Sequence, residues 1–295
     1  MFPPFVLNPT RVRDHFAMRD ERPAAEDNAF VRQPIGVSER DMLLSTSNQT
    51  QKEIPMAAAA PILSLVAGAM AVLGVAGAFL GLVAPLTGFY LFAGGALLGG
   101  LVSVIVSLIA IVLTRGGADP AGRTKALTGL AIGLGLMIIV LGAGAASNAG
   151  DAPSINDITT DLDNPPKFTT SIVVPDYVGR NMNYPDEFKS VVRESYPDLA
   201  PLRVAGSKED TFRRAIAVAE EMGWEIVARS ESNGVFDAQD VSTIFRFVDD
   251  IAIRVTATNS GSRLDMRSKS RDGKSDLGAN AARIRAYFER FAAGS

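Results

Sequence analysis

The densest group of side chains capable of chemistry lies near the C-terminus, between residues 267 and 283. Its cations, hydroxyls and amide fall at a predicted junction between a strand and a helix. The candidate ligand-binding residues are Arg267, Lys269, Arg271, Lys274, Ser275, Asn280 and Arg283. A helix N-terminus presents unpaired backbone N–H groups, and with neighbouring cations it can bind a phosphate, a carboxylate or a lipid headgroup. One interpretation of the stretch is therefore an anion-binding site.

A structural interpretation of the same stretch stays open beside the anion site. Residues two apart on a strand share a face, so Arg267, Lys269 and Arg271 would face one way and the serines between them the other. The arginines would then pair with aspartates, and a residue at the start of the helix would cap it. The residues with structural roles in this interpretation are Asp249, Asp250, Asp265, Gly273, Asp276 and Gly278.

Several familiar chemistries are excluded by what the sequence lacks. The run from Gly273 to Ser275 ends like a nucleotide phosphate loop, but the glycine required five residues earlier is replaced by Ser268. The chain has no cysteine, and its one histidine, His15, lies far from the C-terminal region, so a Ser-His-Asp or Cys-His set cannot form there. We predict no catalytic residue, no metal site and no cofactor, and we favour a protein that is not an enzyme.

The elements that must position these residues form a predicted α+β domain. Ser207 caps a helix that ends near Met222, and residues 277–291 form a second helix with apolar side chains three and four apart. The predicted strands are 224–231, 234–239, 242–248, 250–259 and 263–270, with a lead-in strand at 170–175. This order predicts an antiparallel sheet of about five to six strands with two main helices on one face. The aromatic residues expected in its core are Trp224, Phe236, Phe245 and Phe247.

A long apolar region precedes this domain. Residues 54–114 are 61 consecutive positions without a charge, and a second uncharged run covers 126–148. Because a membrane span needs about 20 apolar residues, the two runs predict a three-span domain over 54–148. The expected spans are 61–83, 89–113 and 127–146, with a tight turn over 85–88 between the first two.

The basic residues around the spans predict the topology of the protein. Arg115, Arg123 and Lys125 lie between spans two and three, whereas several aspartates follow span three before the first basic residue. Cytoplasmic loops carry the excess of Lys and Arg. We therefore expect a multi-pass protein of the bacterial inner membrane, with a cytoplasmic N-terminus and a periplasmic or extracytoplasmic C-terminal domain.

Charge and glycine spacing limit the partners. Residues 151–295 contain 19 Lys and Arg against 23 Asp and Glu, so the domain lacks the basic surface of a nucleic-acid-binding protein. The spans contain no ionisable residue, which argues against a transporter or channel. Glycines four apart, which let helices approach closely, predict packing within the three-span domain or, second, a homo-oligomer; they are Gly77, Gly81, Gly95, Gly99, Gly129 and Gly133.

The remaining segments complete the expected organisation. Residues 1–53 are polar with mixed charges and are expected to form a disordered tail, and Met42 and Met56 are alternative starts that would leave the spans intact. Residues 149–185 are a predicted linker that contains the lead-in strand, and 186–295 form the α+β domain.

Three segments together resemble a known family. They are Asn156–Phe168 with its Asn-Pro-Pro-Lys-Phe end, Phe245-Arg-Phe-Val-Asp-Asp250, and the long stretch from Arg267 to Ile284. With the uncharged spans before them, they are similar to the domain-of-unknown-function 1499 family over about residues 150–292. The resemblance implies a bacterial or plastid-associated protein, often linked to a membrane, and it supplies no catalytic residue.

The leading functional hypothesis is a module that is integral to the lipid bilayer and binds an anionic ligand or an envelope protein outside the cytoplasm. Two alternatives remain. A lipid-handling protein or cofactor-independent enzyme would use a cavity between the sheet and its helices, and a membrane scaffold would act through the glycine-rich spans.

Overall fold

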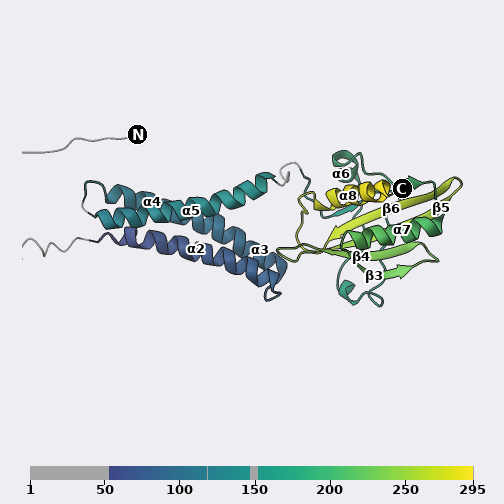
Figure 1. The fold of residues 1–295 in the computed structure, drawn as a ribbon, viewed down its shortest axis with the longest axis horizontal. Helices are drawn as coiled ribbons and strands as arrows, with labels where there is room; N and C mark the ends of the chain where they lie inside the picture. The colour runs from purple at the N-terminus through teal and green to yellow at the C-terminus, as the bar shows by residue number, and fades with distance from the viewer. Residues whose placement is uncertain (1–52, 118, 147–151, 295) are drawn as a thin grey trace, which may run out of the picture. The chain divides into compact units, whose positions relative to one another are not determined.

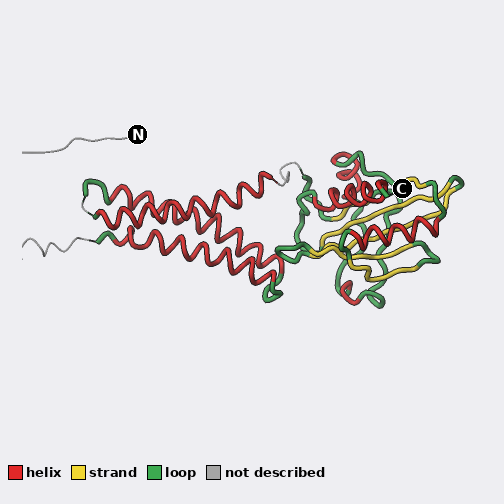
Figure 2. The backbone as a smooth tube through the Cα atoms, viewed as in Figure 1, coloured by secondary structure: helices red, strands yellow, loops and turns green. Residues whose placement is uncertain are grey.

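The computed structural model describes residues 53–117, 119–146 and 152–294, all within one compact unit. Three long helices come first along the chain, and a sheet with its helices follows (Figures 1 and 2). The predicted disordered tail, including His15, lies outside the described residues.

Three helices are long and apolar enough to span a membrane, which indicates a membrane protein and agrees with the predicted spans. The first is α2 (Pro55–Phe79), and the third is α5 (Pro120–Ala146). The second consists of α3 (Pro85–Ala93), the π-helix η1 (Gly94–Gly99) and α4 (Gly100–Leu113). The predicted turn over 85–88 is wrong by one helical turn. Pro85 begins α3 instead, because the fixed φ of proline suits the first position of a helix and its missing N–H is not needed there.

Small residues bring these helices together. A Cβ on Gly74 would lie 2.5 Å from the carbonyl oxygen of Gly88, and one on Gly95 would lie 2.8 Å from that of Ala67. The hydroxyl of Ser64 donates to the carbonyl oxygen of Gly129 at 2.9 Å. Such approaches leave no room for a larger side chain, so these glycines serve packing within the chain.

Of the other glycines in the predicted pairs, some pack against a neighbouring helix and one forms a turn. Gly99, Gly129 and Gly133 also face neighbouring helices of the same chain, whereas Gly81 lies in the turn after α2 with φ +70° and nothing near its missing side chain. Gly81 therefore shapes the turn instead of joining two helices.

The C-terminal domain is an α+β fold with a six-stranded antiparallel sheet, as predicted. Its strands are β1 (Asp157–Thr159), β2 (Leu202–Val204), β3 (Glu225–Ser230), β4 (Val235–Val241), β5 (Val248–Thr258) and β6 (Gly261–Ser270). The order is β1-β6-β5-β4-β3, and β2 pairs with the other end of β6. Its helices are η3 (Pro175–Tyr177), α6 (Phe188–Ser195), α7 (Lys208–Glu221) and α8 (Ala279–Ala293).

An apolar core lies between one face of the sheet and helices α7 and α8. Alternate residues of β6, Leu264 and Met266, are fully buried there, and Trp224 stacks on Tyr287 of α8 with ring centroids 5.1 Å apart. The remaining fully buried side chains include Phe212, Phe236, Ile251, Ile253, Ile284 and Phe291. Side chains therefore occupy the space in which the lipid-handling alternative expects a cavity.

The capped helix forms as its sequence predicts. The Ser207 hydroxyl accepts from the backbone N–H of Asp210 at 3.1 Å and donates to the carboxylate of the same residue at 2.7 Å. Gly223, with φ +82°, follows the end of α7. This reciprocal cap satisfies one free N–H group of the first turn.

Two predicted strands are wrong. Residues 242–247 form a turn between β4 and β5, and only Val248 belongs to β5. Residues 170–175 form a turn that leads into η3, because the hydrogen bonds of Val173 and Val174 go back to the carbonyl oxygen of Thr170. The strand that enters the sheet early is β1, inside the segment expected to be a linker.

Two of the four expected core aromatics lie elsewhere. Trp224 and Phe236 are buried in the core, but Phe245 and Phe247 are only half-buried, in the turn before β5. Their rings contact Phe89 of α3, at centroid distances of 5.5 Å and 6.3 Å. Their spacing fits a core strand, but their apolar surface is covered by the membrane helices.

Candidate functional site

Strand β6 separates the residues of the predicted site onto two faces of the sheet. Its partner strands β1 and β5 pair with it in register, so Arg267, Lys269 and Arg271 face away from α7 and α8. Ser268 and Ser270 face the helices. Most of the candidate residues therefore belong to two separate polar networks, which we call the ionic face and the helix-side network.

Arg267 is the centre of the ionic face and is only 1% exposed. Its Nε and Nη2 donate to both carboxylate oxygens of Asp157, at 2.8 Å and 2.7 Å, and Nη1 donates to the carbonyl oxygen of Pro166 at 3.3 Å. The rings of Phe168 and Tyr184 cover the guanidinium, with centroids 4.7 Å and 5.2 Å from its carbon. A bidentate partner and two aromatic rings leave this cation no open side.

The other two cations of the ionic face are also paired. Lys269 donates to Asp157 at 3.2 Å. Arg271 forms a bidentate pair with Asp250, at 2.9 Å and 2.7 Å, and reaches Asp176 at 3.0 Å. The hydrogen bond from Arg271 holds the pKa of the Asp176 carboxyl below its usual value. Burial raises the pKa of the Asp250 carboxyl, and the hydrogen bond and charge of Arg271 oppose that rise.

The helix-side network joins the start of α8 to the edge of the sheet. Arg283 donates to Asp240 at 2.8 Å and to Asp249 at 2.5 Å. It also donates to the amide oxygen of Asn280 at 2.7 Å, and this oxygen accepts from Ser268 at 2.6 Å. Asn280 is fully buried, so its hydrogen bonds fix α8 on the sheet.

The corner between β6 and α8 is shaped by backbone bonds. The Asp276 carboxylate accepts from the N–H groups of Gly278 and Asn280, at 2.8 Å and 3.0 Å, and so caps α8. Gly273 and Gly278 have φ values of +81° and +84°, a region that glycine adopts without strain. The Ser275 hydroxyl accepts from the N–H of Leu277 at 3.2 Å. These contacts already satisfy several groups that an anion would need.

Lys274 is the exception among the candidate cations. It is exposed, and within the described ranges its ammonium group has no hydrogen bond or ion pair. The seven candidates thus do not converge on one point: three lie on the ionic face, two in the helix-side network, and Lys274 and Ser275 at the corner.

Asp237 is a buried carboxyl on the ionic face that sequence reasoning missed. It accepts from the backbone N–H of Thr169 at 2.8 Å and from the Tyr177 hydroxyl at 3.4 Å, and no cation in the described part of the chain pairs with it. Burial raises the pKa of Asp237 to about 6, and the neighbouring charge of Asp250 contributes to the rise. The available signal was alternation along β4, because Asp237 lies between the core residues Phe236 and Ala238 and so faces the other side of the sheet.

A polar cleft of about 510 Å³ lies beside the ionic face and was also missed. Arg193 of α6, Arg203 of β2 and Arg263 of β6 line it with Asp161 and Asp163. Arg203 lies directly opposite Arg263 in the β2–β6 register. Arg263 pairs with Asp161 at 2.6 Å. We call this cleft the arginine cleft.

Two cations of the arginine cleft differ from those of the ionic face. Arg193 and Arg203 are exposed, and their guanidinium groups have no hydrogen bond or ion pair among the residues that the structure describes. Like charges opposite one another on neighbouring strands are unfavourable unless something of opposite sign lies between them. Neither α6 nor β2 was predicted, because β2 has only three residues and the apolar spacing of Phe188, Val191 and Val192 in α6 extends over a single short helix.

Among the described residues, no group of three or more acidic, histidine or cysteine side chains is arranged to hold a metal ion. The oxygen-rich ionic face has an arginine or lysine beside most of its carboxylates, and these cations occupy the positions that an ion would take.

Comparison with known proteins agrees with the resemblance found in the sequence. Residues 157–291 match the model of a family described as Protein of unknown function (DUF1499). No curated protein matches the chain. The matched region begins at the first residue of β1 and ends in α8, so it includes the whole sheet and both networks. The C-terminal domain is therefore similar to the DUF1499 family over residues 157–291.

Proposed function

We propose that this protein is a membrane-tethered binding module whose C-terminal domain recognises an anionic ligand or an acidic surface of an envelope partner. The proposal does not include catalysis. The three apolar helices would hold the domain at the bilayer, and the sheet would provide the rigid platform on which charged side chains are presented.

The arginine cleft carries the proposal. Arg193 and Arg203 come from different elements and lie in one cleft without a carboxylate partner, whereas Arg267 and Arg271 each have a bidentate one. A cation that is already paired must lose its partner before it can bind a ligand. The unpaired arginines have no such cost, and a planar guanidinium suits phosphate and carboxylate groups.

The location of the domain is part of the proposal. Arg115 lies in the connection between α4 and α5, and Arg123 and Lys125 lie in the first turns of α5. The rule that basic residues flanking the spans stay inside the cell therefore supports a cytoplasmic connection. The C-terminal domain, which follows α5, would then be periplasmic. A homo-oligomer through the glycine pairs is not proposed, because Gly95 and Gly129 already pack within the chain.

Binding of two simple probes tests the cleft. We would titrate the full-length protein in neutral detergent micelles with inorganic phosphate and with a short polyglutamate peptide, at low salt. The double variant Arg193→Ala/Arg203→Ala should bind the preferred probe at least about tenfold more weakly, because two charge-assisted hydrogen bonds are lost.

The matched control is Arg229→Ala, which removes another exposed arginine without a partner in the described chain, on the far edge strand β3. It should bind as the wild type does. Equal affinities of the wild type and both variants would reject the cleft as the binding site.

A further inference from the structure

The turn between β4 and β5 contains an arginine between two aromatic residues, in a motif that the proposed function does not use. Ser242 closes this turn: its N–H donates to the carbonyl oxygen of Phe247 at 2.8 Å, and its hydroxyl accepts from the N–H of Phe247 at 2.9 Å. The N–H of Arg246 donates to the carbonyl oxygen of Ser242 at 3.2 Å. Three hydrogen bonds therefore hold the base of the turn.

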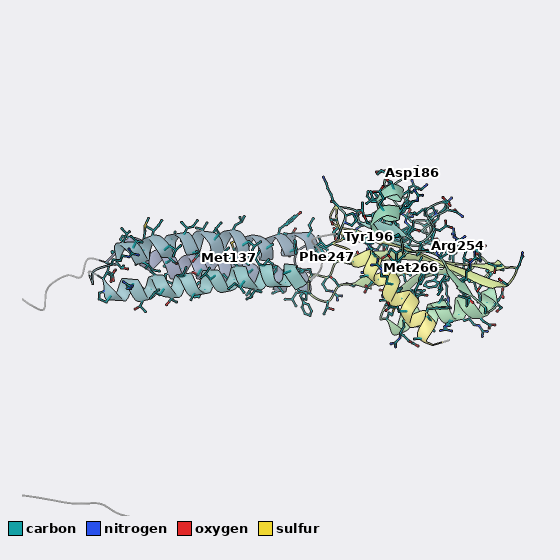
Figure 3. All side chains as sticks on the ribbon, turned by 90° about the horizontal axis from the view of Figure 1, so that it is seen from above. Met137, Asp186, Tyr196, Phe247, Arg254 and Met266 are labelled. Atoms are coloured by element: carbon teal, nitrogen blue, oxygen red, sulfur yellow. The ribbon has the colours of Figure 1, made fainter. Side chains whose placement is uncertain are left out.

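Aromatic residues fix the loop against the second apolar helix. Phe245 contacts Phe92 and Phe89 with centroid distances of 5.6 Å and 5.5 Å, and Phe247, labelled in Figure 3, also contacts Phe89. Ile244, at the tip, is 56% exposed. Tyr90, which follows Phe89 in α3, is 63% exposed, and tyrosine is enriched at the level at which a membrane helix meets water. The loop therefore lies where lipid headgroups are expected.

Arg246 is held in a conformation that is unusual for its residue type. Its φ is +62°, a region that residues other than glycine enter only at a cost. Its side chain is exposed and, within the described ranges, makes no hydrogen bond or ion pair. A strained backbone that presents an unpaired cation beside aromatic anchors suggests a binding role for the cation.

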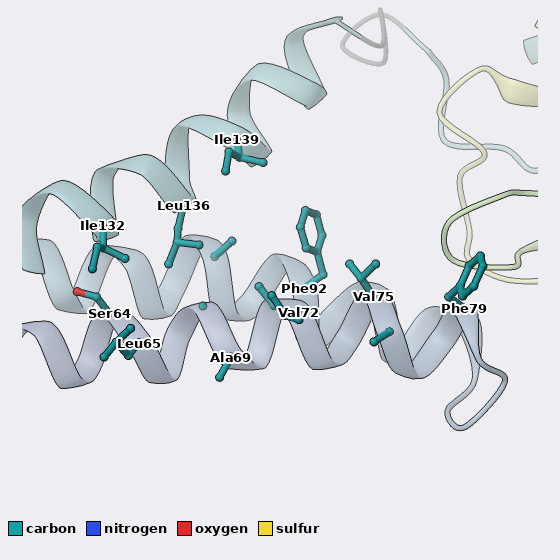
Figure 4. A pocket seen from close by; sticks show the side chains of 14 residues that line it. Ser64, Leu65, Ala69, Val72, Val75, Phe79, Phe92, Ile132, Leu136 and Ile139 are labelled. Atoms are coloured by element: carbon teal, nitrogen blue, oxygen red, sulfur yellow. The ribbon is translucent and has the colours of Figure 1, made fainter.

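An apolar groove ends close to this cation. It has a volume of about 570 Å³ and lies between α2 and α5, and Figure 4 shows α5 diverging from α2 along its length. Its walls include Val72, Val75, Phe79, Phe92, Leu136 and Ile139. Phe79 also lines the second cavity, of about 520 Å³, to which Arg246 contributes. Phe79 is thus a shared wall of the groove and of the cavity that Arg246 lines, and it places the cation next to the groove's end.

We propose that this junction binds one anionic phospholipid, with its phosphate on the Arg246 guanidinium and one acyl chain in the groove between α2 and α5. The apolar walls alone would not select a lipid, since the surrounding acyl chains are equally apolar. Selection comes from Arg246, the one charged side chain that lines the cavity at the groove's end. The proposal goes beyond the arginine cleft, which uses different residues.

Lipid selectivity in a bilayer provides the test. The full-length protein is reconstituted in vesicles of equal parts phosphatidylglycerol and phosphatidylcholine, and spin-labelled forms of each lipid report the fraction immobilised by the protein. The wild type should prefer phosphatidylglycerol. Arg246→Gln should lower that preference about fivefold, the factor expected for one cation at an anionic surface.

Three further variants make the result specific. Arg246→Gly should lose the preference equally while relieving the positive φ, so its folding, followed by Trp224 emission, stays intact. Ile139→Trp fills the groove and should lower the immobilised fraction of both lipids. Arg229→Gln is the control and should retain the preference.

Two outcomes would overturn the proposal. One is an unchanged phosphatidylglycerol preference in both Arg246 variants. The other is a preference that inorganic phosphate at millimolar concentration abolishes while Ile139→Trp leaves it intact, which would indicate a free-anion site. The cleft variant Arg193→Ala/Arg203→Ala should retain the lipid preference, so failure of either proposal can be recognised separately.

Discussion

The two faces of the sheet bury side chains of opposite character. On β6, Leu264 and Met266 point into an apolar core, whereas Asp265 and Arg267, their neighbours in the chain, point into the ionic face. All four are no more than 1% exposed. The first face is stabilised by removing apolar surface from water, and the second is tolerable only because each buried charge has a partner.

A cluster of basic residues in a sequence does not by itself show that the cations are free to bind a ligand. Arg267 and Arg203 are both arginines on adjacent, paired strands, yet the first is enclosed by Asp157 and two rings and the second has no partner in the described chain. The ionic face is distinguished by its many basic residues. The arginine cleft is distinguished by Arg193 and Arg203, which have no partner in the described chain. The second property is the one that a ligand can use.

The largest effect is expected from Arg267→Ala. Removal of this side chain leaves the Asp157 carboxylate buried beside Lys269 alone, and breaking a buried pair typically destabilises by about 3–5 kcal/mol. Urea unfolding of the full-length protein in micelles measures the change, with the emission of Trp224, the single tryptophan, as the reporter of the domain. Stability close to that of the wild type would mean that Arg267 is not structural.

Met266→Ala tests the apolar face at the adjacent position. The side chain is fully buried among apolar neighbours, and its truncation should destabilise the domain by about 2–5 kcal/mol through lost burial and the cavity left behind. The same Trp224 measurement applies. This loss should be nearly independent of pH, and a strong pH dependence would contradict the assignment of Met266 to the apolar face.

Asp237→Asn should stabilise the domain at high pH. The folded pKa of Asp237 is about 6, above the ordinary 3.8, so folding favours the protonated carboxyl. Its contribution is fully present below about pH 4 and is lost as the pH rises through 6. Since one pKa unit corresponds to about 1.4 kcal/mol, the variant should gain on the order of 2–3 kcal/mol at pH 8.

The comparison between pH values is the check on this prediction. Asparagine can still accept the hydrogen bond from Thr169, so the advantage of the variant should shrink towards zero between pH 8 and pH 4. An advantage of the same size at both pH values would show that titration of Asp237 is not its cause.

The smallest effect is expected from Arg203→Ala. An exposed side chain without a partner contributes little to folding, so the free energy of unfolding should change by less than about 0.5 kcal/mol. Removal of the cation opposite Arg263 should, if anything, stabilise the sheet at low salt. A loss as large as that of Arg267→Ala would remove the distinction between the cleft and the ionic face.

Much of the fold could be predicted because its signals are local. Alternation along residues 251–257 identified β5, and serine and glycine marked the ends of α7. The turn at 242–247 could not be predicted, because an apolar run with two phenylalanines looks the same whether a sheet core or a membrane helix covers it. Only the contact with Phe89 separates the two cases.

The sequence predicts which residues of the candidate site are basic and which face of the sheet they occupy, but it does not predict the residues with which they pair. The period of a strand places Arg267 and Arg271 on one face of β6, and the sequence shows this directly. The partner of Arg267, however, lies 110 residues earlier in the chain, in a segment that composition marks as a linker. Pairing over such a distance depends on the register of β1 with β6, which no local pattern encodes.

A double-mutant cycle on Asp157 and Arg267 tests the central claim most directly. The free energy of unfolding is measured by urea and Trp224 emission for Asp157→Leu, Arg267→Met and the double variant in the full-length protein. Each single variant should lose about 3–5 kcal/mol, and the double variant should recover most of that loss, because the two fully buried charges are replaced together. Lys269 also loses Asp157 as a partner, but its side chain is 16% exposed and so reaches water. Losses that simply add, or an Arg267→Met variant as stable as the wild type, would contradict a structural role for the ionic face.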